Sequence, residues 1–189
     1  TDMLRVGTVG TSSIMRTIQE AIRLTDGMEC RVVYSRTEEQ GRAFAAEMGV
    51  PEHCTDYAAM LERSDLDLID IASPNRFHVE QALAALEHGK HVIVEKPAAV
   101  TRGDVQRLID AARANGVYFF EAITTLFMPQ YEACRLLLPK LGRIEQAHIT
   151  YAQYSSRYDA YLRGENPNIF NPAMQAGALN DMGVYCVHM

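Results

Sequence analysis

The sequence predicts an α/β fold, a doubly wound parallel sheet, followed by the beginning of a second domain of the α+β class. Three observations predict this fold. Up to residue 122, short runs rich in Val, Ile and Leu alternate with helical patterns of about a dozen residues. A turn that contains Gly10 joins the first apolar run to the first helical pattern. After residue 122 this alternation stops, and the order of the elements changes.

The first domain, residues 1–122, takes its strands from apolar runs that turn residues separate. The expected strands are Leu4–Val9, Glu29–Tyr34, Leu66–Ala72, Val92–Val94 and Val117–Phe120. The helices between them have an apolar face or a capping residue, and they lie near residues 14–26, 37–49, 56–64, 77–88 and 101–115. Because crossovers between parallel strands are right-handed, these units give a Rossmann-like domain.

The second domain, residues 123–189, is expected to contain a helix at Pro129–Lys140 and a strand at Arg143–Tyr154. The strand is predicted from alternating apolar residues, which suit a sheet that is covered on one side. A final helix is expected from about Ala178. Since residue 189 falls inside that helix, we expect either a fragment or a domain that continues further.

Composition and charge exclude several classes of protein. The 189 residues are 48% hydrophobic and 22% charged, so the chain can bury a core. The net charge of −6, with no block of Lys and Arg, argues against binding to nucleic acid. No apolar run approaches the roughly 18 residues of a membrane span, and the first residues do not resemble a signal peptide. The four cysteines form no CxxC pair, which is typical of reduced thiols in a cytoplasmic protein.

A metal site is not expected. No cluster of His, Cys, Asp and Glu has the spacing of metal ligands. The best pair, His88 and His91, lies on either side of Gly89 at a helix end.

Lys96 directly follows an apolar run, between Glu95 and Pro97. Open parallel sheets bind their ligands at the carboxyl ends of the strands. A lysine at this place is therefore a candidate for catalysis. The alternative is a surface lysine that caps the strand.

The turn after the first strand consists of Gly10, Thr11, Ser12, Ser13 and Ile14. Backbone amides at a helix N-terminus, together with the helix dipole, suit a pyrophosphate. The turn departs from the GxGxxG pattern, because a serine stands at the second glycine position and a methionine at the third. An ordinary strand–turn–helix is the alternative interpretation.

The second strand ends in Ser35 and Arg36, where NAD sites usually carry an acidic residue. A guanidinium can bind a 2′-phosphate through two hydrogen bonds. We therefore predict NADP in preference to NAD. The alternative is a solvated arginine at the start of a helix.

Four spaced motifs together resemble one family. They are the Gly7 to Gly10 opening, Ser73-Pro74-Asn75 with His78, GKHVIVEKP, and GALNDMGVY. The chain resembles the glucose–fructose oxidoreductase / inositol dehydrogenase / MocA family of NAD(P)-dependent oxidoreductases, and within it the tyrosine-containing subgroup of dihydrodiol and xylose dehydrogenases. The resemblance implies a two-domain enzyme that transfers a hydride between a nicotinamide and a sugar, polyol or dihydrodiol carbon. It also implies a mostly antiparallel sheet in the second domain, and a homo-oligomer.

The resemblance also assigns residues to the cofactor site. It places Ser73, Pro74 and Asn75 on the nicotinamide-ribose side, and we add Glu95 and Lys96 to the same site. His78 either binds the pyrophosphate or caps its helix. Beyond the third motif, Glu121 is either a hinge or a residue on the substrate side.

The catalytic residues that the resemblance implies are Lys96, Asp181 and Tyr185. Asp181 and Tyr185 are four residues apart, so they share one face of a helix. Removal of a hydride from a carbinol carbon needs a base for the hydroxyl proton, and a nearby ammonium favours the phenolate of a tyrosine. Whether Lys96 or Tyr185 carries the proton stays open. His188 lies on the same face, with simple packing as its alternative.

Two positions depart from the family pattern. Tyr185 stands where many relatives have histidine, and Ala176-Gly177 stands where two glycines are usual. A non-catalytic regulatory protein that binds NAD(P) with the same fold is the alternative function.

Overall fold

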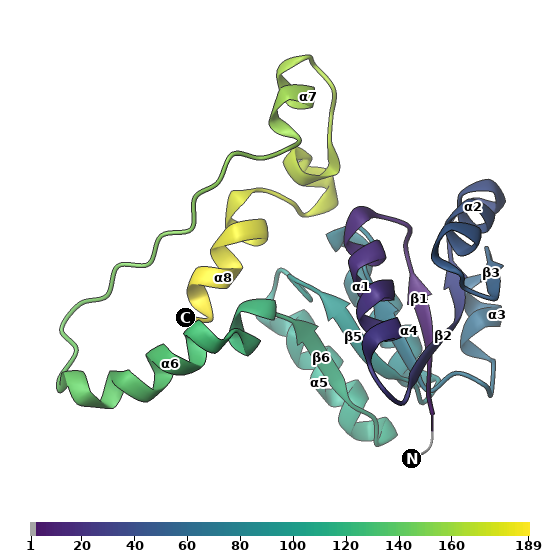
Figure 1. Ribbon diagram of the computed structural model, residues 1–189, viewed down its shortest axis with the longest axis horizontal. Coiled ribbons are helices and arrows are strands. Elements are labelled where there is room, and N and C mark those ends of the chain that lie inside the picture. The colour runs from purple at the N-terminus through teal and green to yellow at the C-terminus, as the bar shows by residue number, and fades with distance from the viewer. Residues whose placement is uncertain (1–2) are drawn as a thin grey trace. The chain divides into compact units, whose positions relative to one another are not determined.

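The structure is a computed structural model that describes residues 3–189. The chain divides into two units, one that ends at Glu121 and a second at Ala122–Met189 (Figure 1). The sequence prediction placed the boundary after residue 122.

A six-stranded sheet forms the centre of the first unit, in the order β3-β2-β1-β4-β5-β6. The strands are β1 (Leu4–Val9), β2 (Met28–Tyr34), β3 (Glu52–Cys54), β4 (Leu68–Ile71), β5 (His91–Glu95) and β6 (Phe119–Ala122). β1 pairs in parallel with β2 on one side and β4 on the other, and β2–β3 and β4–β5 are also parallel. The order reverses between β1 and β4, which makes this place the switch point of the sheet. The predicted doubly wound fold is confirmed.

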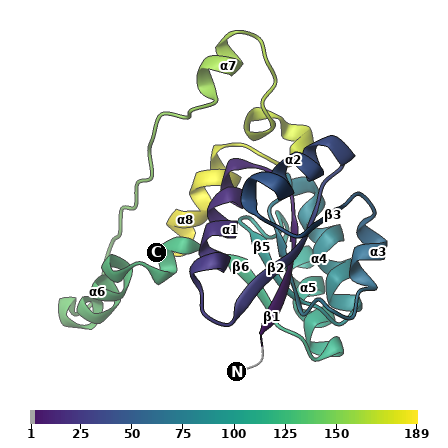
Figure 2. The same cartoon turned by 45° about the vertical axis from the view of Figure 1, so that its right-hand side comes forward.

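Helices lie on both sides of the strands (Figure 2). They are α1 (Ser13–Leu24), α2 (Glu38–Met48), α3 (Tyr57–Leu61), α4 (His78–Glu87) and α5 (Arg102–Asn115). The predicted caps are present, since the side chains of Thr37, Asp56 and Thr101 each accept a hydrogen bond from the backbone amide three residues further along the chain. Each such cap contributes about 1 kcal/mol.

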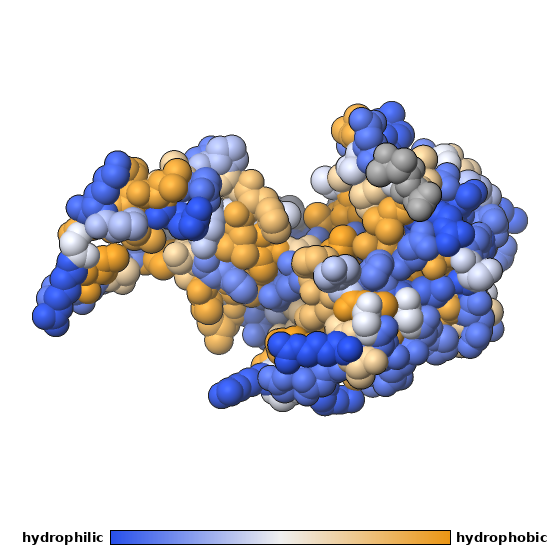
Figure 3. Space-filling model, turned by 90° about the horizontal axis from the view of Figure 1, so that it is seen from below, coloured by the Kyte–Doolittle hydropathy of each residue, from blue (hydrophilic) through white to orange (hydrophobic). Residues whose placement is uncertain are grey.

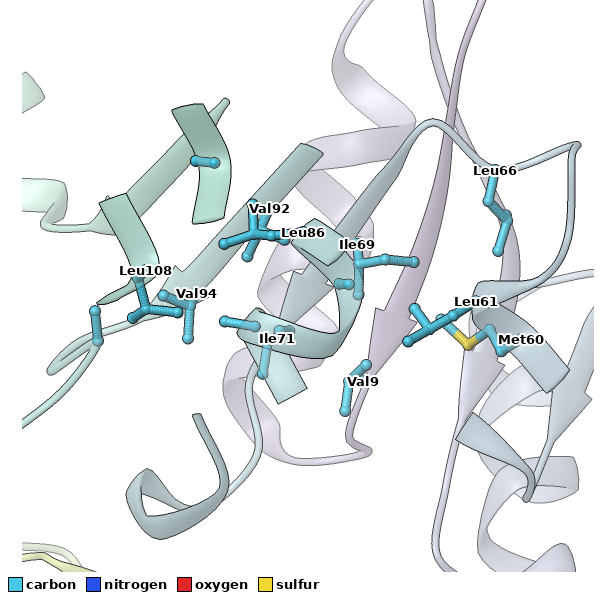
Figure 4. Close-up of a cluster of buried hydrophobic side chains, with 14 of the residues drawn as sticks. Val9, Met60, Leu61, Leu66, Ile69, Ile71, Leu86, Val92, Val94 and Leu108 are labelled. Atoms are coloured by element: carbon cyan, nitrogen blue, oxygen red, sulfur yellow. The ribbon is translucent and has the colours of Figure 1, made fainter. Parts of the chain in front are cut away.

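The core consists of two apolar layers, one on each face of the sheet. On one face, Ile69, Ile71, Val92 and Val94 pack against helix residues such as Leu108 (Figure 4). On the other face, the strands pack against α1 and α2 through Met15, Ile22, Phe44 and Ala45. Because each fully buried aliphatic side chain contributes about 1.5–3 kcal/mol, these layers hold the strand ends in place.

The second unit consists of short helices and turns. Its helices are α6 (Pro129–Leu137), α7 (Tyr158–Leu162) and α8 (Val184–Val187), with a π-helical turn at Leu179–Gly183 and 3₁₀ turns at Thr124–Phe127, Leu138–Leu141, Asn168–Phe170 and Pro172–Met174. The predicted helix at Pro129–Lys140 is confirmed, although its last turn is 3₁₀. Many apolar side chains are exposed, among them Phe127 and Leu141. Hydrophobic surface, in orange, is interspersed with hydrophilic surface in Figure 3.

The predicted strand at Arg143–Tyr154 is wrong. The structure gives these residues no regular secondary structure, and none of residues 3–189 pairs with them. A strand exists only where a neighbour accepts and donates its backbone hydrogen bonds. The alternating apolar residues indicate which face of a strand would be covered, but they supply no partner.

Candidate cofactor and active site

Gly10 forms the turn at the switch point of the sheet. Its φ is +115°, and a Cβ atom at this position would lie 2.8 Å from the carbonyl oxygen of Ala72. Its amide donates to the carbonyl oxygen of Tyr34 at 3.0 Å. Among the glycines of residues 3–189 with a positive φ, it is the one whose Cβ would meet other atoms of the chain. The turn is thus pressed against the end of β4, and only glycine fits there.

The N-terminus of α1 follows this turn and is accessible. Ser12 is the N-cap residue, but its side chain makes no capping hydrogen bond, and the first turn of the helix contains no acidic residue. Ser12, Ser13 and Ile14 are exposed, and Thr11 is half-buried. Because the first amides of a helix lack acceptors within the helix, this end can bind an anion.

Ser35 and Arg36 lie at the end of β2, as predicted. Ser35 is buried and its amide donates to the carbonyl oxygen of Cys54 at 3.0 Å, whereas Arg36 is exposed. Within residues 3–189, no carboxylate forms an ion pair with the guanidinium of Arg36. Gly41 of α2 packs closely here, because a Cβ atom on it would lie 3.2 Å from the Cβ atom of Ser35. The close helix fixes Ser35 and leaves Arg36 accessible to an anion.

Ser73 and Pro74 lead from β4 into a 3₁₀ turn, Asn75–Phe77. The hydroxyl of Ser73 donates to Oε1 of Gln81 at 2.6 Å. This bond attaches the predicted ribose loop to α4.

His78 is the first residue of α4 and only 1% exposed. Its Nδ1 lies 2.8 Å from the carbonyl oxygen of Pro97, and its Nε2 lies 2.7 Å from that of Ser73. Burial lowers the pKa of His78, while the two carbonyl oxygens oppose that shift. Each ring nitrogen thus faces a backbone carbonyl oxygen, and a neutral imidazole, which carries a single N–H, donates to one of the two. The predicted contact with the cofactor stays a prediction.

Lys96 directly follows Glu95, the last residue of β5. The peptide bond between Lys96 and Pro97 is cis. The next residue, Ala98, is 3% exposed, and its amide donates to Oε1 of Glu121 at 2.8 Å. Glu121 lies on β6, so a neighbouring strand holds the turn that carries the lysine.

Asp70 is a buried acid that the sequence analysis missed. It lies in the middle of β4 and is 6% exposed, and its Oδ1 has no hydrogen-bond partner. Burial, together with the negative charge of Glu95, raises the pKa of Asp70 to about 7. The signal was an acidic residue inside an otherwise apolar run between Ile69 and Ile71.

Asp181 and Tyr185 both lie in the second unit. Asp181 belongs to the π-helical turn, and its amide donates to the carbonyl oxygen of Gly177 at 2.9 Å. Tyr185 belongs to α8, and its ring stacks on that of Tyr151 with 5.3 Å between the centroids. The predicted common face assumed an α-helix, whereas a π turn has a longer period. The predicted proximity of Lys96 to Tyr185 stays a prediction.

Neither a metal-binding cluster nor a membrane-spanning helix is found within residues 3–189. No three or more side chains of His, Cys, Asp and Glu come together in a way that could hold a metal ion. In the same range, no helix has both the length and the apolar character to cross a bilayer.

The parallel sheet, the glycine turn at its switch point and the accessible end of α1 define a Rossmann domain of the kind that binds a dinucleotide. Residues 4–123 match the profile of the oxidoreductase family with an NAD-binding Rossmann fold, and the chain belongs to this Gfo/Idh/MocA family. The resemblance to the family predicted from the motifs is confirmed, and the tyrosine-containing subgroup stays a prediction.

Relatives in two bacteria match almost the whole chain. It is 41% identical over 185 residues to the uncharacterized oxidoreductase YgjR of Escherichia coli, covering 98% of this chain and 56% of that protein. It is 38% identical over 186 residues to the scyllo-inositol 2-dehydrogenase (NADP(+)) IolU of Bacillus subtilis, covering 98% of this chain and 57% of that protein. The chain thus spans little more than half the length of these curated relatives.

Among solved structures, the chain is similar to KijD10, a 3-ketoreductase from Actinomadura kijaniata in complex with NADP and TDP-benzene. The TM-score is 0.69 at 30% identity, over 74% of this chain and 43% of that one. The first unit is an NAD(P)-binding Rossmann domain.

Proposed function

We propose that this chain carries the cofactor domain and the catalytic lysine of an NADP-preferring oxidoreductase. The enzyme transfers a hydride between the nicotinamide and a sugar, polyol or dihydrodiol carbon. One observation carries the proposal: Lys96 and the Gly10 turn follow parallel strands at the same edge of the sheet. In open α/β sheets, this edge is where ligands bind.

The residues of the first unit fit the cofactor. The exposed N-terminus of α1 suits the pyrophosphate, and no side chain caps it. The accessible guanidinium of Arg36 suits a 2′-phosphate, and the name of the relative IolU specifies NADP(+). The bound nicotinamide supplies the hydride chemistry, and the protein supplies orientation and proton transfer.

Proton transfer is the task of Lys96 together with Tyr185 of the second unit. Oxidation of a carbinol releases the hydroxyl proton as the hydride leaves, so a group within hydrogen-bond reach must accept it. The ammonium of Lys96 would stabilise the phenolate of Tyr185, and Asp181 adds a carboxylate from the adjoining turn. Either Lys96 or Tyr185 can be the group that exchanges the proton with the substrate.

The test is a screen of the full-length protein with NADP and NAD against aldoses, polyols and trans-dihydrodiols. The Lys96→Met variant should then lose about 10²–10⁴-fold in kcat on the best substrate, because positioned proton transfer contributes that much. The dissociation constant for NADPH should change little. Near-normal kcat in Lys96→Met would refute the proposal. Tight binding of NADPH without turnover of any compound would favour a regulatory protein.

A further inference from the structure

We propose that His78 and Glu121 are positioning residues that hold the turn of Lys96 from two sides. The inference rests on the proposed catalytic role of Lys96. In this proposal the buried His78 binds the backbone of the lysine turn, and the backbone partner of Glu121 is the amide of Ala98.

The two contacts fall on consecutive residues directly after the lysine. The ring of His78 lies 2.8 Å from the carbonyl oxygen of Pro97, and the amide of Ala98 donates to Oε1 of Glu121 at 2.8 Å. The first comes from α4 and the second from β6, so the turn after β5 is attached to the elements that precede and follow it in the chain. Pro97 and Ala98 are buried, and the contact of His78 with Pro97 is buried, whereas that of Ala98 with Glu121 is partly buried.

His78 also connects the lysine turn to the ribose loop. Its second ring nitrogen lies 2.7 Å from the carbonyl oxygen of Ser73, at the end of β4. One imidazole therefore lies between the backbone of two segments that are predicted to contact the cofactor, and its single N–H in the neutral form donates to one of them. Burial has the largest effect on the pKa of His78 and lowers it. The negative charge of Glu121 raises this pKa and the positive charge of Lys96 lowers it, as expected if both groups lie near the imidazole.

The two residue types satisfy backbone groups of the lysine turn at a cost in hydration. A buried imidazole and a partly buried carboxylate both lose hydration, and an apolar side chain of similar size would avoid that cost. Here the polar groups bind the backbone of a turn, where hydrogen bonds set the path of the chain. Since a shift of about 1 Å can reduce the rate of an enzyme about 100-fold, such bonds matter at a catalytic lysine.

The experiment compares matched pairs of variants in the full-length protein, with the best substrate from the screen. Glu121→Gln retains an oxygen that can accept from Ala98, whereas Glu121→Ala does not. His78→Asn places an amide nitrogen near the Nδ1 position and can still reach Pro97, whereas His78→Gln places it near Nε2, toward Ser73. Ile22 packs in a core cluster that contains neither His78 nor Glu121. Ile22→Ala is therefore the control for an effect of reduced stability alone.

We expect kcat to fall about tenfold or more in Glu121→Ala and His78→Gln, with a dissociation constant for NADPH within about threefold of the wild type. Glu121→Gln and His78→Asn should retain most of the kcat of the wild type. Ile22→Ala should lower Tm with little change in kcat. These outcomes together would separate positioning from stability.

One result would refute the positioning role, and a different result would refute the proposed function. If Lys96→Met is inactive but Glu121→Ala and His78→Gln lower only Tm, the positioning role is refuted and the proposed function stands. If Lys96→Met keeps near-normal kcat, the catalytic role of Lys96 in the proposed function is refuted.

Discussion

Replacement of Gly10 by alanine tests whether the turn at the switch point is fixed by close packing. Two costs add at this position. An L-residue at φ +115° is strained by about 1–2 kcal/mol. In addition, the new Cβ would lie 2.8 Å from the carbonyl oxygen of Ala72, a backbone atom that cannot rotate away. Such overpacking costs about 1–3 kcal/mol, so Gly10→Ala should lose about 2–5 kcal/mol in total.

The chain offers a matched control in Gly27. Its φ is +83°, but no atom lies within 4 Å of the position of an added Cβ. Gly27→Ala should therefore cost only the strain, about 1–2 kcal/mol. The difference between the two variants isolates the contact with Ala72.

Two measurements on the full-length protein follow from this. Urea unfolding monitored by circular dichroism should rank wild type, Gly27→Ala and Gly10→Ala in falling order of stability. Titration of NADPH by its own fluorescence should show a dissociation constant raised about tenfold, or ~1.4 kcal/mol, in Gly10→Ala alone, because the displaced turn moves the first amides of α1. Equal destabilisation by the two variants, or unchanged binding of NADPH in Gly10→Ala, would refute the reasoning.

Two further predictions concern cofactor choice and pH. Arg36→Ala should raise KM for NADP about tenfold and leave KM for NAD within about twofold, because only NADP carries the 2′-phosphate; equal effects on both would contradict this. Asp70 has a folded-state pKa raised to about 7, above the ~3.9 of an unfolded aspartate, so its contribution to stability is present below pH ~4 and is lost as pH rises through 7. Asp70→Asn should therefore flatten the fall in Tm between pH 4 and 8, and identical pH profiles would exclude the effect.

The sequence predicted those parts of the fold that depend on local patterns. The apolar run of the first strand, the glycine of the turn that follows it and the caps at Thr37 and Thr101 are local signals, because neighbouring residues in the chain are enough to identify them. β3 was missed, since Glu52–Cys54 has no apolar run and becomes a strand through its pairing with β2. At Arg143–Tyr154 the opposite error occurred, because the pattern was present but none of residues 3–189 forms a strand that pairs with it.

The same distinction applies to the site. The positions of Lys96 and Arg36 at strand ends could be predicted, because they follow from where the apolar runs stop. The partners of His78 could not, since Pro97 is 19 residues away and only the packing of α4 against β5 brings it near. Asp70 was missed for a similar reason, because its raised pKa depends on burial by the sheet and on Glu95 of the next strand.

The contacts of the lysine turn bear on how its position depends on the compound that is turned over. β4, β5 and β6 are consecutive in the sheet, so the ends of β4 and β5, which lead to Ser73 and Lys96, lie near Glu121 of β6. The bonds from His78 and Glu121 go to backbone atoms, so they depend little on which side chains surround them. If these bonds position the lysine turn, Glu121→Ala should lower kcat by a similar factor for every compound that the full-length protein turns over.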